Sequence, residues 1–144
     1  MKRKVIPSRN KKETTKSTRK RIVRNVFRFI MEGRPKDSLY LFARNCKQHN
    51  PYIKGNMEAL FDSMVAVQQQ VPKFSDPYFA IKKILGEGDT VAVHTELLNS
   101  KSAPSEGGLR QVHLFRFGKD NKIVEYWDIT QMVQLEMPNP ANAF

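Results

Sequence analysis

The sequence predicts an α+β domain, with helices gathered on one side of a mostly antiparallel sheet. In the first half of the chain the apolar residues recur at helical spacing, and after Pro77 the periodicity becomes extended. The extended segments then follow one another with short turns, as in an antiparallel sheet. The chain has 144 residues, which is enough for one domain with a real core. Helices that close over a curved sheet leave a concave space, so we expect a pocket between the two layers.

The first half of the chain predicts three helices, over residues 14–31, 36–44 and 56–70. The first has apolar residues at i, i+1, i+4, i+5 and i+8 from Ile22, and it ends before Gly33 and Pro35. The third has Asn56 as its expected N-cap and Pro72 as its stop. The basic residues on the solvent side of the first helix are expected only to hydrate it. These are Arg19, Lys20, Arg24 and Arg28.

The second half predicts four strands in two hairpins. Residues 78–85 and 90–98 are separated by the turn sequence GEGD, and residues 110–131 form a second hairpin that turns at residues 118–122. Between the helices, residues 46–52 are predicted to form a short extended piece, broken by Pro51. The polar residues 99–109 are predicted to form a loop.

The second hairpin carries the side chains that we expect to line the pocket. If Phe117 pairs with Ile123, alternation along the strands assigns each residue to one face of the sheet. One face, expected to line the cavity, then carries His113, Phe115, Glu125 and Trp127. The other face, available to a partner subunit, carries Val112, Leu114, Arg116, Val124, Tyr126 and Asp128.

A second pair of titratable side chains lies in the preceding strand. His94 and Glu96 are two residues apart, so they share a face, opposite to the apolar face that belongs to the core. Two interpretations stand. Either the carboxylate holds a charge on the histidine near neutral pH, or the two form an ordinary solvent-facing polar pair.

A metal site is not expected. The three histidines, with Glu96, are the obvious ligands, but their spacing matches no compact metal-binding motif. No sequence feature calls for a cofactor.

The net charge of +11 is concentrated at one end of the chain. Residues 1–28 carry twelve Lys and Arg and one acid, which gives 12 − 1 = +11, and residues 29–144 carry 13 basic and 13 acidic residues, which gives zero. Residues 1–13 are predicted to be a flexible basic segment, with residues 14–144 forming the single domain. Residues 1–13 either keep the protein soluble or contact nucleic acid or anionic lipid electrostatically, and nucleic-acid association would use residues 1–28.

The remaining composition indicates a protein of the cytoplasm. The single cysteine, Cys46, allows no internal disulfide, which fits a reducing compartment. No apolar run is long enough to span a bilayer, and no hydrophobic stretch of the secretory type follows the basic N-terminus.

Several stretches together resemble the SnoaL-like group of the NTF2-like superfamily, which includes polyketide-cyclase-like proteins. They are HNP at residues 49–51, IKKILGEGDTVAVHTE at 81–96, VHLFRF at 112–117, KIVEYWDITQ at 122–131 and the terminal NPANAF. The resemblance covers residues 20–144. It implies a cone-shaped α+β fold with three N-terminal helices and a deep pocket, commonly dimeric through the sheet.

The resemblance also implies a chemistry without cofactors. Active members remove a proton next to a carbonyl while neighbouring donors stabilise the enolate. Residue by residue, the positions that match the group are His49, His94, Trp127 and Asp128. The group typically has Asp where this chain has His113, so the usual acid/base assignment does not transfer directly.

Three functions compete on these grounds. In the first, the protein is a cofactor-free cyclase, isomerase or dehydratase acting on a hydrophobic carbonyl compound, with His113, His94 and Glu96 as proton-handling residues. Its pocket would then be lined by His49, Phe115, Glu125, Trp127 and Asp128. In the second, it is a non-catalytic module that binds a small ligand or dimerises. In the third, it associates with nucleic acid through residues 1–28.

Overall fold

A computed structural model describes residues 14–70, 78–103, 107–134 and 136–138 of the chain. The predicted flexible segment 1–13 and the NPANAF tail lie outside these residues. The elements in chain order are α1 (Thr15–Met31), the 3-10 helix η1 (Pro35–Leu41), β1 (Phe42–Gln48), α2 (Met57–Gln70), β2 (Tyr78–Glu87), β3 (Thr90–Leu98), β4 (Gly108–Phe117) and β5 (Ile123–Val133).

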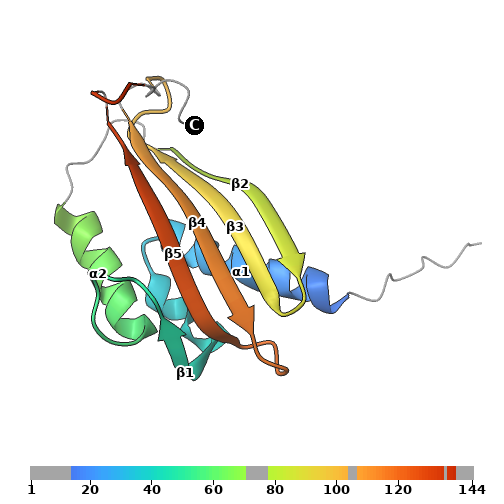
Figure 1. Ribbon diagram of the computed structural model, residues 1–144. Coiled ribbons are helices and arrows are strands. Elements are labelled where there is room, and N and C mark those ends of the chain that lie inside the picture. The colour runs from blue at the N-terminus through green and yellow to red at the C-terminus, as the bar shows by residue number, and fades with distance from the viewer. Residues whose placement is uncertain (1–13, 71–77, 104–106, 135, 139–144) are drawn as a thin grey trace, which may run out of the picture.

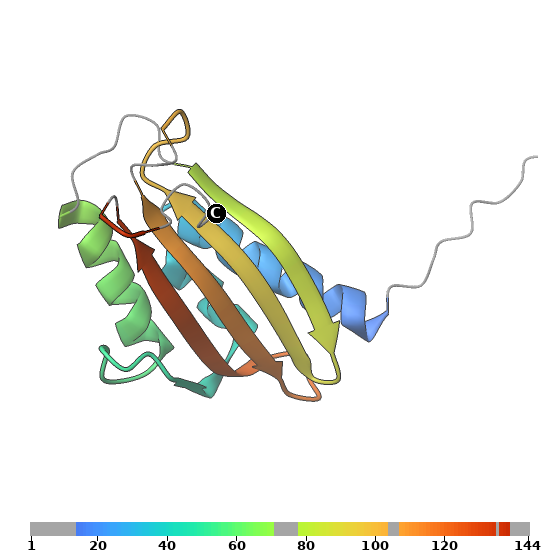
Figure 2. The same cartoon turned by 45° about the horizontal axis from the view of Figure 1, so that its top comes forward.

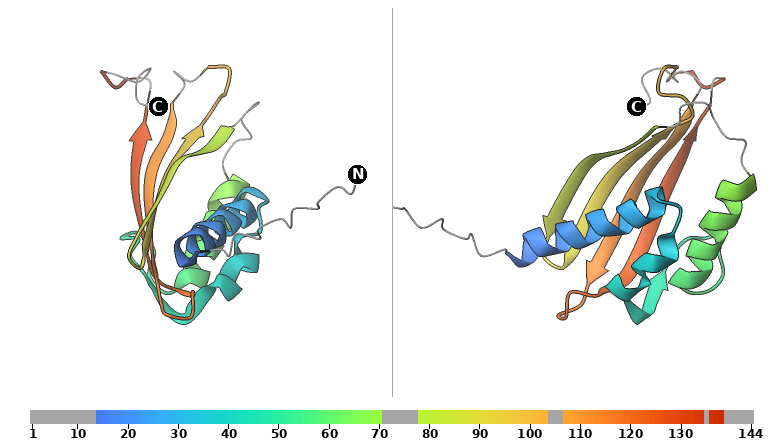
Figure 3. Two further views of the ribbon diagram at one scale, coloured as in Figure 1. Left: turned by 90° about the vertical axis from the view of Figure 1, so that its right-hand side faces the viewer. Right: turned by 180° about the vertical axis from the view of Figure 1, so that it is seen from behind.

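The five strands form one sheet in the order β1-β5-β4-β3-β2. All neighbours are antiparallel except β1 and β5, which run parallel. Both α-helices and η1 lie on one face, and the face turned to the viewer in Figure 1 carries no helix. Figure 2 shows α1 behind β2 and β3 and α2 beside β5, and the edge-on view in Figure 3 separates the two layers. The α+β prediction is confirmed.

The core lies between the helices and the covered face of the sheet. Val23, Val26 and Phe27 of α1 pack in it with Phe61 of α2 and Phe115 of β4, all nearly inaccessible to solvent. These side chains come from the apolar stripes that the helical spacing predicts. Burial of such stripes is the main term that holds the helices on the sheet.

Side chains cap the start of both α-helices, at Asn56 as predicted and at Thr14, for which no capping role was predicted. The Thr14 side chain accepts a hydrogen bond from the backbone N–H of Ser17 at 3.1 Å, and the Asn56 side chain accepts one from Ala59 at 3.1 Å. Each bond satisfies a backbone donor that the first turn of a helix leaves without an intrahelical partner. After α1, Gly33 adopts a positive φ of 74°, which ends the helix.

The helix predicted over residues 36–44 is present only in its first part, and its end is wrong. A 3-10 helix ends at Leu41, and Phe42 begins the strand β1, so the sheet gains a fifth strand that was predicted only in part. The sequence of β1, FARNCKQ, has little intrinsic strand preference. Its extended conformation follows from pairing with β5 and from burial of Phe42 and Cys46 on the core side.

The predicted register of the β4–β5 hairpin is wrong beyond its first pair. Phe117 pairs with Ile123 as expected, but Arg116 then pairs with Glu125, which leaves Val124 as the extra residue of a β-bulge. From there on every residue of β5 faces the side opposite to the predicted one. Tyr126 therefore turns into the core, and Trp127 turns to the bare face.

Arg19 does more than hydrate α1, contrary to the expectation. Its guanidinium donates to the carbonyl oxygens of Gly88 and Gly118, at 3.2 and 3.3 Å, and to the Asn121 side chain at 3.0 Å. It also lies 5.4 Å from the centre of the Phe117 ring. One side chain thus joins the helix to the turns of both hairpins.

We predict that Arg19→Met lowers the free energy of unfolding by about 1–2 kcal/mol, because the variant keeps the apolar stem and loses three charge-assisted hydrogen bonds. Urea denaturation measures the change. The matched control is Arg24→Met on the exposed side of the same helix, which should stay within about 0.5 kcal/mol of the wild type. Equal effects of the two substitutions would show that the contacts to the turns add nothing.

Candidate functional site

Three polar side chains meet in the apolar core beneath α1. His113 of β4 lies with its Nε2 3.1 Å from the Thr95 hydroxyl oxygen and its Nδ1 2.8 Å from the Tyr126 hydroxyl oxygen. The Phe27 ring packs edge-on against the imidazole, with the centres 4.9 Å apart. His113 and Thr95 are 4% and 0% exposed. Both ring nitrogens are therefore hydrogen-bonded, one as donor and the other as acceptor.

Burial decides the charge state of this network. It lowers the pKa of His113 from 6.5 to about 4, because the core disfavours the imidazolium. It also raises the pKa of Tyr126 well above 10, and the nearby negative charge of Asp128 adds to that rise. At neutral pH the network is therefore an uncharged histidine between two hydroxyl groups.

Asp128 lies next to this network on the same face of the sheet. It pairs with His113 across the β4–β5 ladder, and its Oδ2 accepts a hydrogen bond from the Asn50 side-chain amide at 2.8 Å. Unlike the buried histidine, Asp128 is only half-buried. One step further along the ladder, Gln111 pairs with Thr130, and its amide donates to the Thr130 hydroxyl at 3.0 Å. The covered face thus carries a carboxylate with neutral donors beside it.

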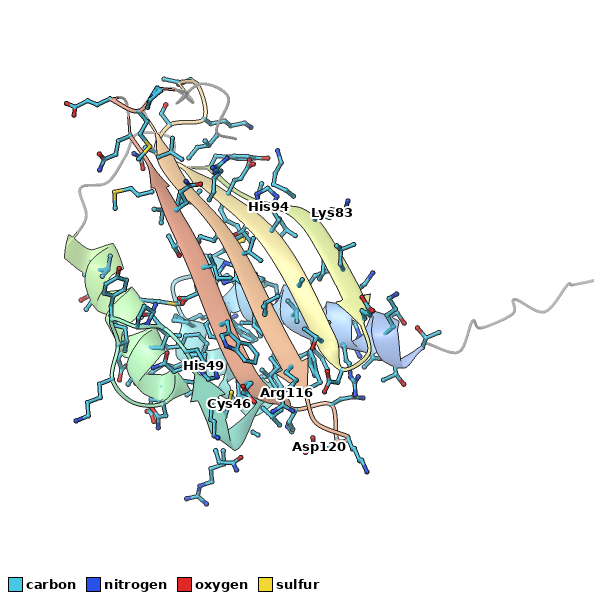
Figure 4. All side chains as sticks on the ribbon, viewed as in Figure 1. Cys46, His49, Lys83, His94, Arg116 and Asp120 are labelled. Carbon is cyan, nitrogen blue, oxygen red and sulfur yellow. The ribbon has the colours of Figure 1, made fainter. Side chains whose placement is uncertain are left out.

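The bare face of the sheet carries a second cluster, near the labels His49 and Arg116 in Figure 4. The His49 ring stacks on Trp127 with the centres 4.6 Å apart and the planes within 7°. Its Nε2 lies 3.0 Å from Glu125, which also accepts a hydrogen bond from Arg116. The hydrogen bonds from Arg116, and secondly from His49, hold the pKa of Glu125 below its usual value.

Cys46 lies at the edge of this cluster as a buried free thiol. Burial, with a smaller contribution from the negative charge of Glu125, raises the pKa of Cys46 to about 12. A thiol with such a pKa is protonated at neutral pH and is a poor nucleophile. Cys46 is therefore a packing residue.

His94 and Glu96 are also on the bare face, toward the other end of the sheet (Figure 4). Their side chains lie 3.8 Å apart, so they are neighbours as the spacing indicates. Glu96 has a second basic neighbour, because the Lys82 ammonium lies 3.3 Å from its other oxygen. The carboxylate is nearly buried, which makes this lysine a structural partner for its charge.

The residues singled out from the sequence therefore do not form one site. The covered face brings together His113 and Asp128, while the bare face carries His49, Glu125 and Trp127 in one cluster and His94 with Glu96 in another. Phe115, expected in the pocket wall, is 1% exposed and belongs to the core. Among the described residues, no group of three or more His, Cys, Asp and Glu side chains is placed to hold a metal ion.

Sequence reasoning missed four residues of the covered face: Asn50, Thr95, Gln111 and Tyr126. Thr95 carried a usable signal, because it is the polar member of the apolar alternation that includes Val91 and Val93. Tyr126 was predicted on the wrong face, because the predicted register lacked the bulge. No local pattern marks Asn50, whose contact with β5 spans 78 positions in the sequence.

The fold defines the class: an α+β domain with helices on one face of a curved sheet, as in NTF2-like proteins. The sequence matches the family model of the SnoaL-like domain over residues 23–126, and the chain belongs to this family. No curated protein matches the chain. In the described part of the chain, no helix is long and apolar enough to cross a membrane.

Solved structures show the same fold at low sequence identity. AclR, a putative hydroxylase from Streptomyces galilaeus, is 17% identical with a TM-score of 0.65, over 82% of this chain and 81% of AclR. SalBIII, described as an epoxide hydrolase/cyclase-like enzyme in pyran ring formation in the polyether salinomycin, is 20% identical with a TM-score of 0.59, over 81% and 93%. A SnoaL-like protein of unknown function from Burkholderia thailandensis is 16% identical with a TM-score of 0.62, over 82% and 98%.

The low pKa of His113 predicts a pH-dependent stability. Below about pH 6.5 the histidine binds a proton in the unfolded chain, but in the folded protein it stays neutral down to about pH 4. The free energy of unfolding therefore falls as the pH falls through this window. His113→Asn removes this contribution, which amounts to about 3 kcal/mol at its limit. Urea denaturation at pH 7, 6, 5 and 4 should show a flatter profile for the variant.

The comparison variant for this experiment is Thr95→Val, which removes a hydrogen bond but keeps the buried histidine. It should lower stability at every pH and leave the steepness of the profile as in the wild type. If His113→Asn is as steep as the wild type between pH 6.5 and 4, His113 does not titrate as its burial requires.

Proposed function

We propose that the protein binds a small hydrophobic carbonyl compound on the helix-covered face of the sheet and carries out cofactor-free acid/base chemistry on it. The observation that carries the proposal is Asp128, a half-buried carboxylate on the covered face, held by Asn50 and adjacent to the neutral His113 network. A carboxylate in such surroundings suits removal of a proton next to a carbonyl, since it is partly desolvated and fixed in position.

The proposal gives the acid/base role to Asp128 and not to His113. Both nitrogens of His113 are engaged within the core, and its low pKa leaves it neutral and weakly basic. We assign to His113 the positioning of Tyr126, the neighbour of Asp128 along β5. Gln111, which pairs with Thr130 on the same face, carries an amide donor that suits an enolate oxygen. His94 and Glu96 have no part in this site, because they lie on the bare face.

The comparisons support a small-molecule substrate at the level of the family. SalBIII is described as acting in the formation of a pyran ring, and AclR is described as a putative hydroxylase. Proteins with this fold therefore include enzymes that act on small molecules. The reaction of this chain is then of the cyclase, isomerase or dehydratase type. Its first step, loss of a proton from carbon, is common to all three.

That first step can be tested without the natural substrate. Hydrophobic aryl and cyclic ketones are incubated with the protein in D₂O, and NMR follows deuterium entry at the carbon next to the carbonyl. We expect the wild type to accelerate exchange for the ketones it binds, and Asp128→Asn to lower that rate by about 10²- to 10⁴-fold, the usual contribution of a general base.

The control variant is His94→Gln, a change of an exposed side chain on the bare face, and it should exchange as fast as the wild type. A rate that falls with His94→Gln but not with Asp128→Asn would overturn the assignment and return the chemistry to the bare face. Binding of the ketones with no exchange above background would indicate the second function, a non-catalytic ligand-binding module.

We also propose that two copies pair through the bare face. Val112 and Ile129 lie opposite each other there and are 38% and 60% exposed, and Leu85 on β2 is 54% exposed. Apolar residues in the middle of an uncovered sheet suit a self-complementary two-fold interface. The stacked His49–Trp127 pair would extend the interface toward β1.

We predict that Ile129→Glu converts a dimer into a monomer, because two carboxylates would be buried near the two-fold axis. Sedimentation equilibrium should give twice the chain mass of 16.7 kDa for the wild type and the single mass for the variant. The control is Val67→Glu on α2, which replaces an equally exposed apolar residue on the covered side and should remain dimeric. A wild-type protein that is monomeric at concentrations of tens of micromolar would contradict the proposal.

We propose that the protein is located in the cytoplasm. The single cysteine is buried, protonated and free, so the fold depends on no disulfide. A hydrophobic metabolite handled by a cofactor-free enzyme is compatible with that compartment. Fractionation of cells that produce the full chain would test it directly.

A further inference from the structure

The excess positive charge of the protein continues from the N-terminal segment onto one helix. Of the twelve basic residues in positions 1–28, six belong to α1, and this helix contains no acidic residue. Residues 29–144 balance at zero. The buried face of α1 is used up by the core, so all of this charge is carried on the remaining sides of the helix.

The basic residues of α1 form a row. Lys16, Lys20, Arg24 and Arg28 follow at intervals of four, which places successive side chains about 6 Å apart along the axis and spans about 18 Å in all. Arg24 and Arg28 are exposed, while Lys16 and Lys20 lie at the flank toward β2, with side-chain carbons near Gly86. Figure 3, right, shows α1 from behind with no other element over its outer side.

Little in the described part of the chain neutralises this row. Arg28 has a carboxylate neighbour, Glu32, at 3.6 Å at the end of the helix. Among the described residues, no carboxylate lies within ion-pair distance of Lys16, Lys20 or Arg24. An ordinary solvated helix of this length usually carries both signs of charge, which pair at intervals of four. The absence of acids from α1 leaves a surface of one sign.

From these observations we propose that the basic row of α1 binds the phosphate backbone of duplex nucleic acid. Phosphates provide the complementary charge, and a row of cations that turns by about 40° per step around a rigid helix can contact several of them. Contacts of this kind carry no sequence information, so the binding is not sequence-specific.

Two other polyanions fit the helix less well. A helix that binds a membrane surface needs a free apolar face beside its basic one, but Val23, Val26 and Phe27 are buried against the sheet. Single-stranded nucleic acid is usually held by exposed aromatic rings on which bases stack. The exposed residues of α1 include no aromatic side chain, since Phe27 and Phe29 are both buried.

This surface is independent of the proposed chemistry. Lys16 and Lys20 lie beside Gly86 of the edge strand β2. Asp128 lies on β5, which the order of the strands places near the opposite edge of the sheet. Loss of nucleic-acid binding therefore predicts no loss of proton exchange at Asp128. The two proposals can fail separately.

The test uses the full chain and a fluorescein-labelled 20-base-pair DNA duplex of mixed sequence, titrated by anisotropy between 50 and 200 mM salt. We expect a steep dependence of affinity on salt. The triple variant Lys16→Gln, Lys20→Gln, Arg24→Gln keeps long helix-forming side chains and removes three charges. It should reduce the slope of log K against log salt by about 1 for each lost contact, about 3 in total.

The matched control removes three exposed charges elsewhere, by Arg44→Gln, Lys47→Gln and Lys54→Gln on and after β1. It has the same net charge as the α1 variant and should bind the duplex like the wild type. Equal losses in the two variants would reduce the effect to net charge and overturn the proposal. An unchanged slope in the α1 variant would also overturn it, by placing the contact outside α1.

Two comparison ligands complete the design. A single strand of the same length and vesicles with 30% anionic lipid are titrated with the same proteins. Weaker binding to both than to the duplex supports the proposal. Tighter binding to the strand, or binding to vesicles alone that disappears in the α1 variant, would assign the row to that other polyanion.

Discussion

The unpaired Val124 at the start of β5 determines what the two faces of the sheet can do. Strand side chains alternate, so one extra residue exchanges the inward and outward sets for the rest of the strand. With the bulge, Tyr126 and Asp128 face the helices and Glu125 and Trp127 face outward. Without it, a carboxylate would lie opposite Phe115 in the core with no partner there, at a high cost in desolvation. The bulge therefore allows the core and the site to coexist on one strand.

The buried polar network shows how the core holds His113, at the position where the resemblance to the SnoaL-like group implies Asp. A carboxylate in that position would need charged or multiple donors, because the core strongly disfavours an unpaired negative charge. A neutral imidazole needs only one donor and one acceptor, and Thr95 and Tyr126 supply them at 3.1 and 2.8 Å. Charge is kept at Asp128, which is half-buried and bonded to Asn50.

The sequence predicted those features that depend on local periodicity. The apolar stripe of α1, the cap at Asn56 and both hairpin turns follow from neighbours a few residues apart, and each is found where expected. Two of the failures involve distant partners. The strand state of β1 depends on β5, and the role of Arg19 depends on turns about 69 to 102 residues away. The bulge left a trace in the adjacent Ile123 and Val124, which interrupt the in–out pattern, but a trace of this kind does not say which residue is unpaired.

The environment of each candidate site residue also depends on the folded sheet and not on residue type alone. Histidines are obvious candidates for acid/base chemistry in a sequence because their usual pKa is near neutral. The three histidines of this chain nevertheless have different environments, and only one lies on the covered face. His113 is set apart by burial, His49 by stacking on Trp127, and His94 by its exposed position beside Glu96. Residue type alone cannot separate these cases, since burial and face are properties of the sheet. Asp128, a less conspicuous residue in the sequence, becomes the better candidate because one bulge turns it inward.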